Sequence, residues 1–258
     1  MSPFADDART YTETRTRTSA AYVKFTPDYK VVLRILNPNA KRAWKHWIQE
    51  ANSGKGMMAT CPNITAQTNV CPIERAAKAT PKDDPDYEAK VSAGRARKRF
   101  MVNVLDRTPY TVCPSCNTET PGKICSACQA SLKDSDFVPL NKIKILEGGP
   151  RLFAETLNAI DQLQKEEFGA SITDYDITFV TQGVGREKKI NAIPQEVKFD
   201  ADKNIIPLPK DALTDKETGE PQKLFDLDLL AEPSSSEEIE LMLKGANMQE
   251  INLSRGIA

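Results

Sequence analysis

The stretch DYDITFVTQGVGREKKINAIP, residues 174–194, carries the clearest indication of how this chain folds. Residues 176–181 and 188–193 are short runs rich in apolar and β-branched side chains, which favour strands. Residues 182–185 lie between them and contain two glycines, which suit a turn. We therefore predict a β-hairpin over this stretch.

Three other short apolar runs favour strands, and the first of them ends at the turn Asn37-Pro38-Asn39. These runs are residues 30–36, 100–105 and 142–146. Three further segments have helical composition, and the last has the strongest 3.6-residue apolar period, with a proline in its first turn. We predict these helices over residues 40–51, 84–98 and 150–168. Strands and helices mixed in this way predict an α+β fold.

Length and composition limit the functions open to the chain. Its 258 residues suffice for one large domain or two small ones. It has no apolar run long enough to cross a membrane, and its polar first residues lack the apolar region of a secretion signal, so we expect a soluble protein. Because His46 is the single histidine, any centre that needs several imidazoles is excluded.

Charge is segregated along the chain although the net charge is only −1. Residues 1–110 hold 19 Lys or Arg against 11 Asp or Glu, whereas residues 211–258 hold 4 against 11. This suggests an anionic partner for the first part and an acidic tail that competes for the same surface; solvated charge placed by chance is the alternative. The tail contains a short helix with a capping-box-like start at residues 234–238, and we expect it to be more linker than core.

The most specific motif is a pair of Cys-x-x-Cys knuckles. Cys113 and Cys116 form the first, and Cys125 and Cys128 form the second after eight intervening residues. Two knuckles at this spacing can direct four thiolates to one tetrahedral Zn²⁺, and such a closed shell leaves no position for a reactive water. We therefore predict a structural zinc ribbon, in preference to a redox dithiol, which needs one pair at a helix start.

The two remaining cysteines offer a second zinc site. His46, Cys61, Cys71 and Glu74 follow one another in the chain and would supply one nitrogen, two sulfur atoms and one carboxylate. An ordinary packed or surface histidine is the alternative for His46. The sequence thus predicts one Zn²⁺ and leaves a second one open.

Basic and aromatic residues are interleaved in two places, as in proteins that bind single-stranded nucleic acid. In the predicted helix over residues 40–51, Trp44 and Trp47 would share one face beside Lys41 and Arg42, although both tryptophans could instead pack in the core. The second set is Arg95, Arg97, Lys98, Arg99, Phe100 and Tyr110. A solvated helix end is the alternative for this set.

In their order along the chain, these segments resemble the single-stranded-DNA-binding proteins of tailed bacteriophages, the family typified by that of the T-even phages. The resemblance spans roughly residues 22–195 and is carried by KVVLRILNP, the WKHW motif, CPN to CPIE, RFMVNVLDR, KIKILEGGPRLFAETL and the stretch over 174–194. An acidic tail of similar style follows. Two departures are visible: Glu74 stands where the T-even protein has its last zinc-binding cysteine, and the ribbon looks like an insertion.

The resemblance implies an OB-fold, a five-stranded Greek-key β-barrel whose cleft binds single-stranded DNA with little sequence preference. Together with the composition and the cysteine spacing, it leads us to expect a flexible basic arm over residues 1–21, an OB-fold core over 22–205 with the zinc ribbon inserted at 110–136, and the acidic tail over 206–258. By the same resemblance, Arg15 and Arg17 would mediate self-association of neighbouring protomers on DNA. The tail would recruit replication and recombination proteins in the cytoplasm of an infected bacterial host.

We therefore expect a non-enzymatic protein that coats and protects single-stranded DNA in phage replication, recombination and repair. Because it would bind only the single strand, it would shift the melting equilibrium of hairpins toward the open form without a catalytic step. The alternative is a zinc-ribbon replication or transcription adaptor that binds proteins more than DNA. A nuclease that holds Mg²⁺ is the remaining class, and its candidate clusters, residues 83–86 and 174–176, have the composition of helix starts or turns.

Overall fold

The computed structural model describes residues 21–25, 30–49, 56–62, 71–85, 87–120, 123–125, 127–133, 137–183, 189–216 and 218–244. The chain divides into two compact units. Unit 1 consists of the described residues of 41–101 and 226–258, and unit 2 consists of those of 20–40 and 102–225. Strand β4 (Arg97–Asp106) contributes its residues up to Met101 to unit 1 and the rest to unit 2.

Unit 2 is built on antiparallel strands that are far apart in the sequence. Strand β9 (Asp176–Gln182) lies between β10 (Lys189–Pro194) and β1 (Lys30–Ile35), and β1 pairs in turn with the end of β4. Strand β8 (Lys142–Gly148) also pairs with β4. The antiparallel pairing of β9 with β10 confirms the predicted hairpin, and the other three predicted strands are confirmed as well.

Large apolar side chains from these strands meet in the core of unit 2. The alternating burial of β1 shows that one face of this strand points into that core. Among the fully buried members are Leu33, Leu146, Tyr175, Ile177 and Phe179. The core is therefore assembled from segments separated by more than a hundred residues.

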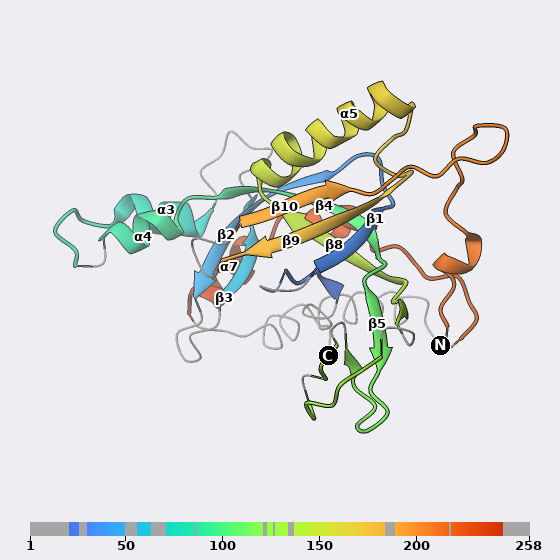
Figure 1. Cartoon of the computed structure of the whole chain (residues 1–258). Helices are drawn as coiled ribbons and strands as arrows, with labels where there is room; N and C mark the ends of the chain where they lie inside the picture. Colours follow the sequence, from blue (N-terminus) through green and yellow to red (C-terminus); the bar gives the residue numbers. More distant parts are fainter. Residues whose placement is uncertain are drawn as a thin grey trace, which may run out of the picture. The chain divides into compact units, whose positions relative to one another are not determined.

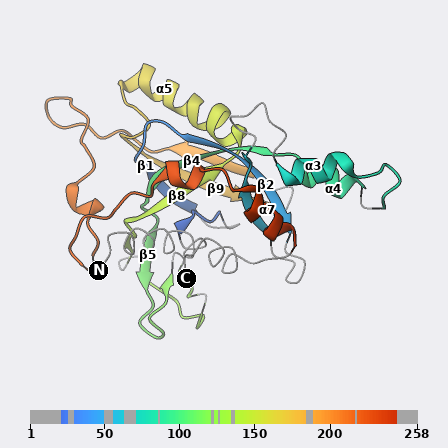
Figure 2. The same ribbon diagram turned by 180° about the vertical axis from the view of Figure 1, so that it is seen from behind.

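The predicted helix over residues 150–168 is confirmed, with an irregular beginning. It starts as a π-helical segment, η3 (Arg151–Leu157), and continues as α5 (Asn158–Phe168). Leu157 joins the core of unit 2, and α5 runs alongside the strands in both ribbon views (Figures 1 and 2). Gly169 ends the helix with a φ of 66°, a left-handed conformation that glycine adopts at little cost.

The cysteine-rich insert of unit 2 has its own small sheet. Strand β5 (Pro109–Val112) lies between β6 (Glu119–Thr120) and β7 (Val138–Pro139). A 3-10 helix, η5 (Lys210–Leu213), follows later in this unit. The insert begins after β4 and ends before β8.

Unit 1 combines three strand segments with helices. Strand β2 (Lys41–Gln49) lies between β3 (Gly56–Thr60) and the first part of β4, and all these pairs are antiparallel. Its helices are α3 (Pro72–Ala79), α4 (Tyr87–Ala93), α6 (Leu227–Ala231) and α7 (Ser236–Leu243). Helices α4 and α6 contact β2, and α3 contacts both α4 and α7.

The prediction of a helix over residues 40–51 is wrong, because residues 41–49 form β2. Trp44 and Trp47 lie three positions apart, so in a strand they point to opposite faces instead of sharing one. The ladders on both sides of β2, to β3 and to β4, satisfy its backbone groups, and such pairing outweighs a weak local helix preference.

The predicted helix over residues 84–98 is too long at both ends. Helix α4 covers Tyr87–Ala93, and residues from Arg97 onward already pair with β2. Gly94 follows the helix at a close approach to α3, where a Cβ atom would lie 2.2 Å from that of Ala77. The basic residues at 97–99 therefore belong to a strand and not to a helix end.

The acidic tail is not only a linker. Helix α7 begins with the predicted capping box, in which Ser235 and Glu238 each bond the other's backbone amide. Ile239 and Met242 of this helix are buried in the core of unit 1. The expectation of more linker than core is thus wrong for α7. In the part of the chain that the structure describes, no helix has the length and apolar character that crossing a membrane requires.

Candidate metal centres and nucleic-acid interface

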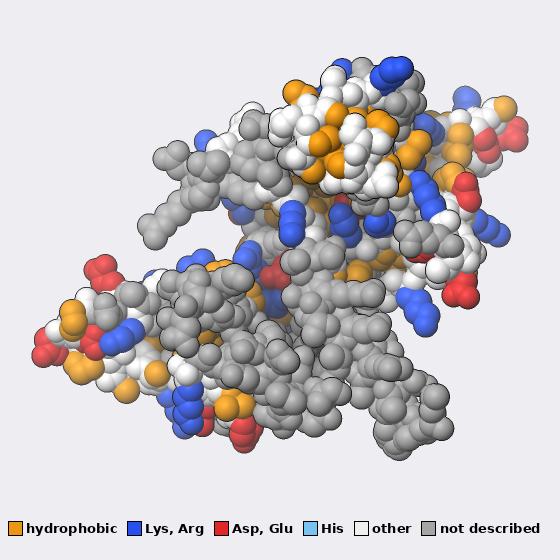
Figure 3. Space-filling model, turned by 90° about the horizontal axis from the view of Figure 1, so that it is seen from below, with side chains coloured by type: hydrophobic (Ala, Val, Ile, Leu, Met, Phe, Trp, Pro, Cys, Tyr) orange, Lys and Arg blue, Asp and Glu red, His pale blue; other side chains and the backbone are white. Residues whose placement is uncertain are grey.

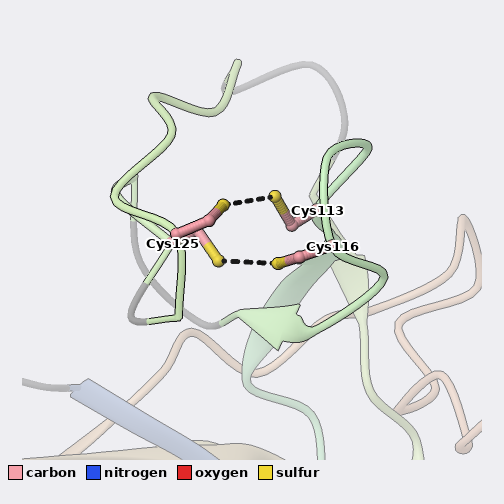
Figure 4. A group of neighbouring side chains, drawn as sticks. Cys113, Cys116 and Cys125 are labelled. Atoms are coloured by element: carbon pink, nitrogen blue, oxygen red, sulfur yellow. Dashed lines mark hydrogen bonds between the residues drawn. The ribbon is translucent and has the colours of Figure 1, made fainter.

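Four cysteines of the insert come together in what we call the ribbon centre: Cys113, Cys116, Cys125 and Cys128. The Sγ atoms of Cys113 and Cys128 are 3.5 Å apart, as are those of Cys116 and Cys125, and all four lie within 4.8 Å of one another. In Figure 4 the sulfur atoms face each other across a common centre. Thiolates around a tetrahedral zinc ion stand about 3.8 Å apart, so the arrangement fits such an ion.

The two knuckles close with the same backbone pattern. The amides of Asn117 and Gln129 donate to the carbonyls of Cys113 and Cys125, at 2.9 and 2.8 Å. Asn117 and Gln129 both have a positive φ, 55° and 62°, which turns the chain sharply after each second cysteine. This repeated turn explains why two separate segments direct their thiols to one point. Sequence reasoning found the cysteines but not these turn residues.

Hydrogen bonds from backbone amides favour the ionised thiols that a metal requires. The amide of Ser115 lowers the pKa of Cys113, and the amide of Cys128 lowers the pKa of Cys125 from 9.0 to about 6. Although the amide of Ala130 also favours the thiolate of Cys128, neighbouring thiols raise its pKa to about 12. A dication would relieve that repulsion, which is the chemical reason this donor set suits a metal.

Three members of the second predicted set, His46, Cys61 and Cys71, come together, and the carboxylate of Glu74 lies next to two of them. We call these four residues the unit 1 centre. The first three are buried, and their ligand atoms lie within 4.8 Å of one another. Cys71 Sγ is 3.4 Å from His46 Nε2, whereas Glu74 Oε1 is 3.5 Å from Cys61 Sγ and 3.9 Å from His46 Nε2. One nitrogen and two sulfur atoms at these separations are compatible with three ligands of a zinc ion, and Glu74 would supply the fourth.

Local structure explains how the unit 1 centre forms. His46 lies on β2 opposite Ala59 of β3, and Cys61 comes directly after β3, where its amide donates to the Trp44 carbonyl. Cys71 is the N-cap of α3, and Pro72 starts that helix, as proline does well. Glu74, in the first turn of α3, then places its carboxylate next to Cys61 and His46.

The surroundings of the buried Cys71 side chain favour its ionised form, the thiolate. A hydrogen bond from Cys61 is the largest cause that lowers the pKa of Cys71 to about 4, and His46 lowers it further against the opposing effect of burial. Cys61 and Cys71 pack in one cluster with Ile239 and Met242. The tail helix α7 therefore helps enclose the unit 1 centre, which sequence reasoning did not foresee.

Strand pairing brings two residues of each basic and aromatic set together within unit 1. Arg42 stands opposite Phe100, and Trp44 stands opposite Lys98, in the ladder between β2 and β4. Residues directly opposite each other, and residues two apart in a strand, share a face of the sheet. We call these four residues the basic-aromatic face; Arg42 is exposed, and the other three are partly buried.

Other predicted contact residues lie in different surroundings. Arg97 and Arg99 stand on the opposite face of the same ladder, with Arg97 exposed, and Trp47 of β2 has the same parity and is 52% exposed. Arg95 is exposed just before β4. Lys41 forms an ion pair with Asp228 of α6.

Tyr110 belongs to unit 2, where Lys216 Nζ lies 5.5 Å from its ring centroid. The self-association residues Arg15 and Arg17 lie outside the described residues. Figure 3 shows Lys and Arg side chains in blue on one face of the molecule.

The acidic clusters considered for a nuclease have structural partners. Asp84 binds Lys90 at 2.8 Å, and Asp176 accepts from both Arg34 and Arg107, at 2.6 and 3.0 Å. The carboxylate of Asp174 accepts from the Ser171 amide. Among the described residues, neither cluster belongs to a group of three potential metal ligands.

The sequence matches no protein-family model and no curated protein.

Proposed function

We propose that this protein binds and coats single-stranded DNA, that its core is of the OB-fold type, and that both of its cysteine centres hold Zn²⁺. Its role would lie in the replication, recombination and repair of phage DNA. Coating would shift the melting equilibrium of hairpins by mass action, so no catalytic step is needed.

The basic-aromatic face is the observation that carries this proposal. Arg42 and Lys98 offer positive charge for phosphates, and Trp44 and Phe100 offer rings on which bases stack. Lys98 Nζ lies 5.2 Å from the Phe100 ring centroid, so charge and ring are adjacent. Strands β2 and β4 contribute these residues from positions more than fifty residues apart in the chain, and their pairing places a cation of each strand opposite an aromatic ring of the other.

The remaining parts of the chain fit the same function. The antiparallel strands of unit 2 are compatible with an OB-fold barrel, the basic residues 1–110 with a polyanion, and the ribbon with a structural zinc. Arg15 and Arg17 would contact neighbouring protomers on the strand. The acidic tail would contact replication or recombination proteins.

The test is a titration of tryptophan fluorescence with oligo-dT and with duplex of equal length, at several salt concentrations. We expect quenching by the single strand and a steep dependence of affinity on salt. Replacing Arg42 and Lys98, the two cations of the basic-aromatic face, by alanine should lower the slope of log affinity against log salt by about 1.4, since each phosphate contact on a single strand contributes about 0.7.

A matched control removes the same charge, one arginine and one lysine, from exposed positions of unit 2: Arg151 and Lys165. This variant should keep a slope close to that of the unchanged protein. Equal slopes in both double variants would refute the phosphate contacts of Arg42 and Lys98. If no single-stranded oligonucleotide binds at all, the proposed function is wrong.

One observation favours a second candidate, the adaptor that binds proteins. Val112, Ile124 and Val138 of the insert are 50%, 58% and 46% exposed, and exposed apolar side chains are common at protein interfaces. An adaptor would retain polymerase or helicase subunits on a column while it shows no affinity for oligo-dT.

A further inference from the structure

Unit 1 contains a cavity of about 810 Å³ to which no ligand has been assigned above, although Trp44 of the basic-aromatic face and Cys61 and Glu74 of the unit 1 centre are among its lining residues. It is bordered by α3, by α4 with the residues that follow it, and by Trp44 of β2. Its volume lies in the range of small-molecule pockets. All of its lining residues belong to unit 1.

The lining combines three kinds of chemistry. Trp44 and Tyr87 contribute aromatic rings, and Lys78 and Arg95 contribute positive charge at the exposed rim. Glu74 contributes a carboxylate whose side chain is 26% exposed, and it connects the cavity to the unit 1 centre. The sequence offered Trp44 and Arg95 as DNA contacts, but nothing in it singled out Tyr87 or Lys78.

The wall of the cavity between α3 and the end of α4 is closely packed, so the cavity exists before any ligand binds. Gly94 approaches Ala77 so closely that any side chain there would collide with α3. Both residues line the cavity. A preformed site of this kind binds without a large ordering cost.

We propose that this cavity binds one nucleotide, with its base against the rings of Trp44 and Tyr87 and its phosphate at Lys78 and Arg95. Aromatic rings stack on any base, and cations hold the phosphate. A carboxylate has about four acceptor positions, so Glu74 accepts a hydrogen bond from an exocyclic amino group in addition to its contacts in the unit 1 centre. Adenine, cytosine and guanine carry such a group, and thymine does not.

This inference rests on the proposed function, because the nucleotide in the cavity would be one residue of the single strand that the protein coats. It adds a preference that a coating protein does not otherwise need: an amino base is favoured over thymine at one position per protomer. A free mononucleotide offers the same chemistry, so the experiment has one arm for each source.

The experiment compares a short all-dT oligonucleotide with one that carries a single dA, and dAMP with dTMP as competitors. We expect the dA-containing strand to bind more tightly than all-dT, and dAMP to compete better than dTMP. Tyr87→Ala should lower the affinity for the dA-containing strand by about 5-fold or more, through lost stacking. Tyr87→Phe, which keeps the ring, should restore it.

Phe199→Ala is the control, since it removes a 40%-exposed aromatic side chain from unit 2 and should change neither affinity. If all-dT and dA-containing strands bind equally well and Tyr87→Ala binds as the unchanged protein does, the cavity proposal is wrong while DNA coating stands. If no strand binds but dAMP does so through Tyr87, the cavity proposal stands and coating is wrong. If neither strands nor mononucleotides bind, both are wrong.

Discussion

Glu74 should make the unit 1 centre the more labile of the two proposed zinc sites. Thiolates are the soft ligands that hold zinc most firmly, and the ribbon centre has four of them, whereas the unit 1 centre has two. Glu74 is also partly exposed and borders a cavity, so a chelator would approach a metal bound in the unit 1 centre from that side. The two centres should therefore release their ions at different rates.

This difference is open to direct measurement with a chromophoric chelator. We expect a fast and a slow phase of zinc release from the unchanged protein. Glu74→Ala should accelerate the fast phase, and Glu74→Cys should slow it, because a third thiolate replaces the carboxylate. Glu88→Ala, at an exposed position of α4, should leave both phases unchanged. Identical release from Glu74→Ala and the unchanged protein would show that Glu74 is no ligand.

The ribbon centre allows a simpler test by metal analysis. The unchanged protein should contain two zinc ions per chain, and Cys125→Ser should contain one, since Cys125 is fully buried in the four-thiol cluster. Ser115→Ala changes an exposed residue between two ligands without removing a side chain that binds. It should retain two ions, and two ions in Cys125→Ser would contradict the assignment.

Helix α7 is the element whose role differs most from expectation. Its sequence is acidic and short, which is typical of a solvated tail, yet its apolar side turns into the core beside Cys61 and Cys71. The capping box fixes where the helix begins, and Arg75 of α3 stands 3.8 Å from Glu240. An exposed pair of this kind adds little, so apolar burial provides most of the stabilisation.

Truncation of the buried side chain measures that contribution. Ile239→Ala should lower the free energy of unfolding by about 2–4 kcal/mol, because Ile239 is fully buried and leaves a cavity. Leu243→Ala removes a 46%-exposed side chain of the same helix and should cost less than about 0.5 kcal/mol. Urea unfolding of both variants supplies the comparison, and equal small losses would place α7 outside the core.

At the scale of the whole molecule, the tail has two separate roles, one electrostatic and one structural. It carries the net negative charge of the chain, and Asp228 already neutralises Lys41, one of the predicted phosphate contacts. It also completes the core of unit 1 through α7. Removing it should therefore destabilise unit 1 as well as expose basic charge.

Two truncations separate these effects. A chain that ends at residue 244 keeps α6 and α7 and should retain two zinc ions. A chain that ends at residue 225 lacks both helices and should lose the ion of unit 1 while it keeps the ribbon ion, because the ligands Cys61 and Cys71 lose their packing partners. Two ions in both truncated chains would mean that the tail has no structural role.

Features with local causes could be predicted from the sequence. The spacing of the ribbon cysteines, the hairpin of β9 and β10, the helix that ends at Gly169 and the capping box of α7 each depend on residues close together in the chain. The likeness to phage proteins rests on the order of such segments, and the function it implies stays a prediction.

Tertiary contacts were needed wherever the partners are distant. Residues 41–49 form a strand because β3 and β4 pair with both of its edges, and no local pattern contains that information. The same pairing places Trp44 opposite Lys98 and brings His46 to Cys61 and Cys71. Backbone hydrogen bonds and apolar burial between distant segments outweigh local preferences of a few tenths of a kcal/mol per residue.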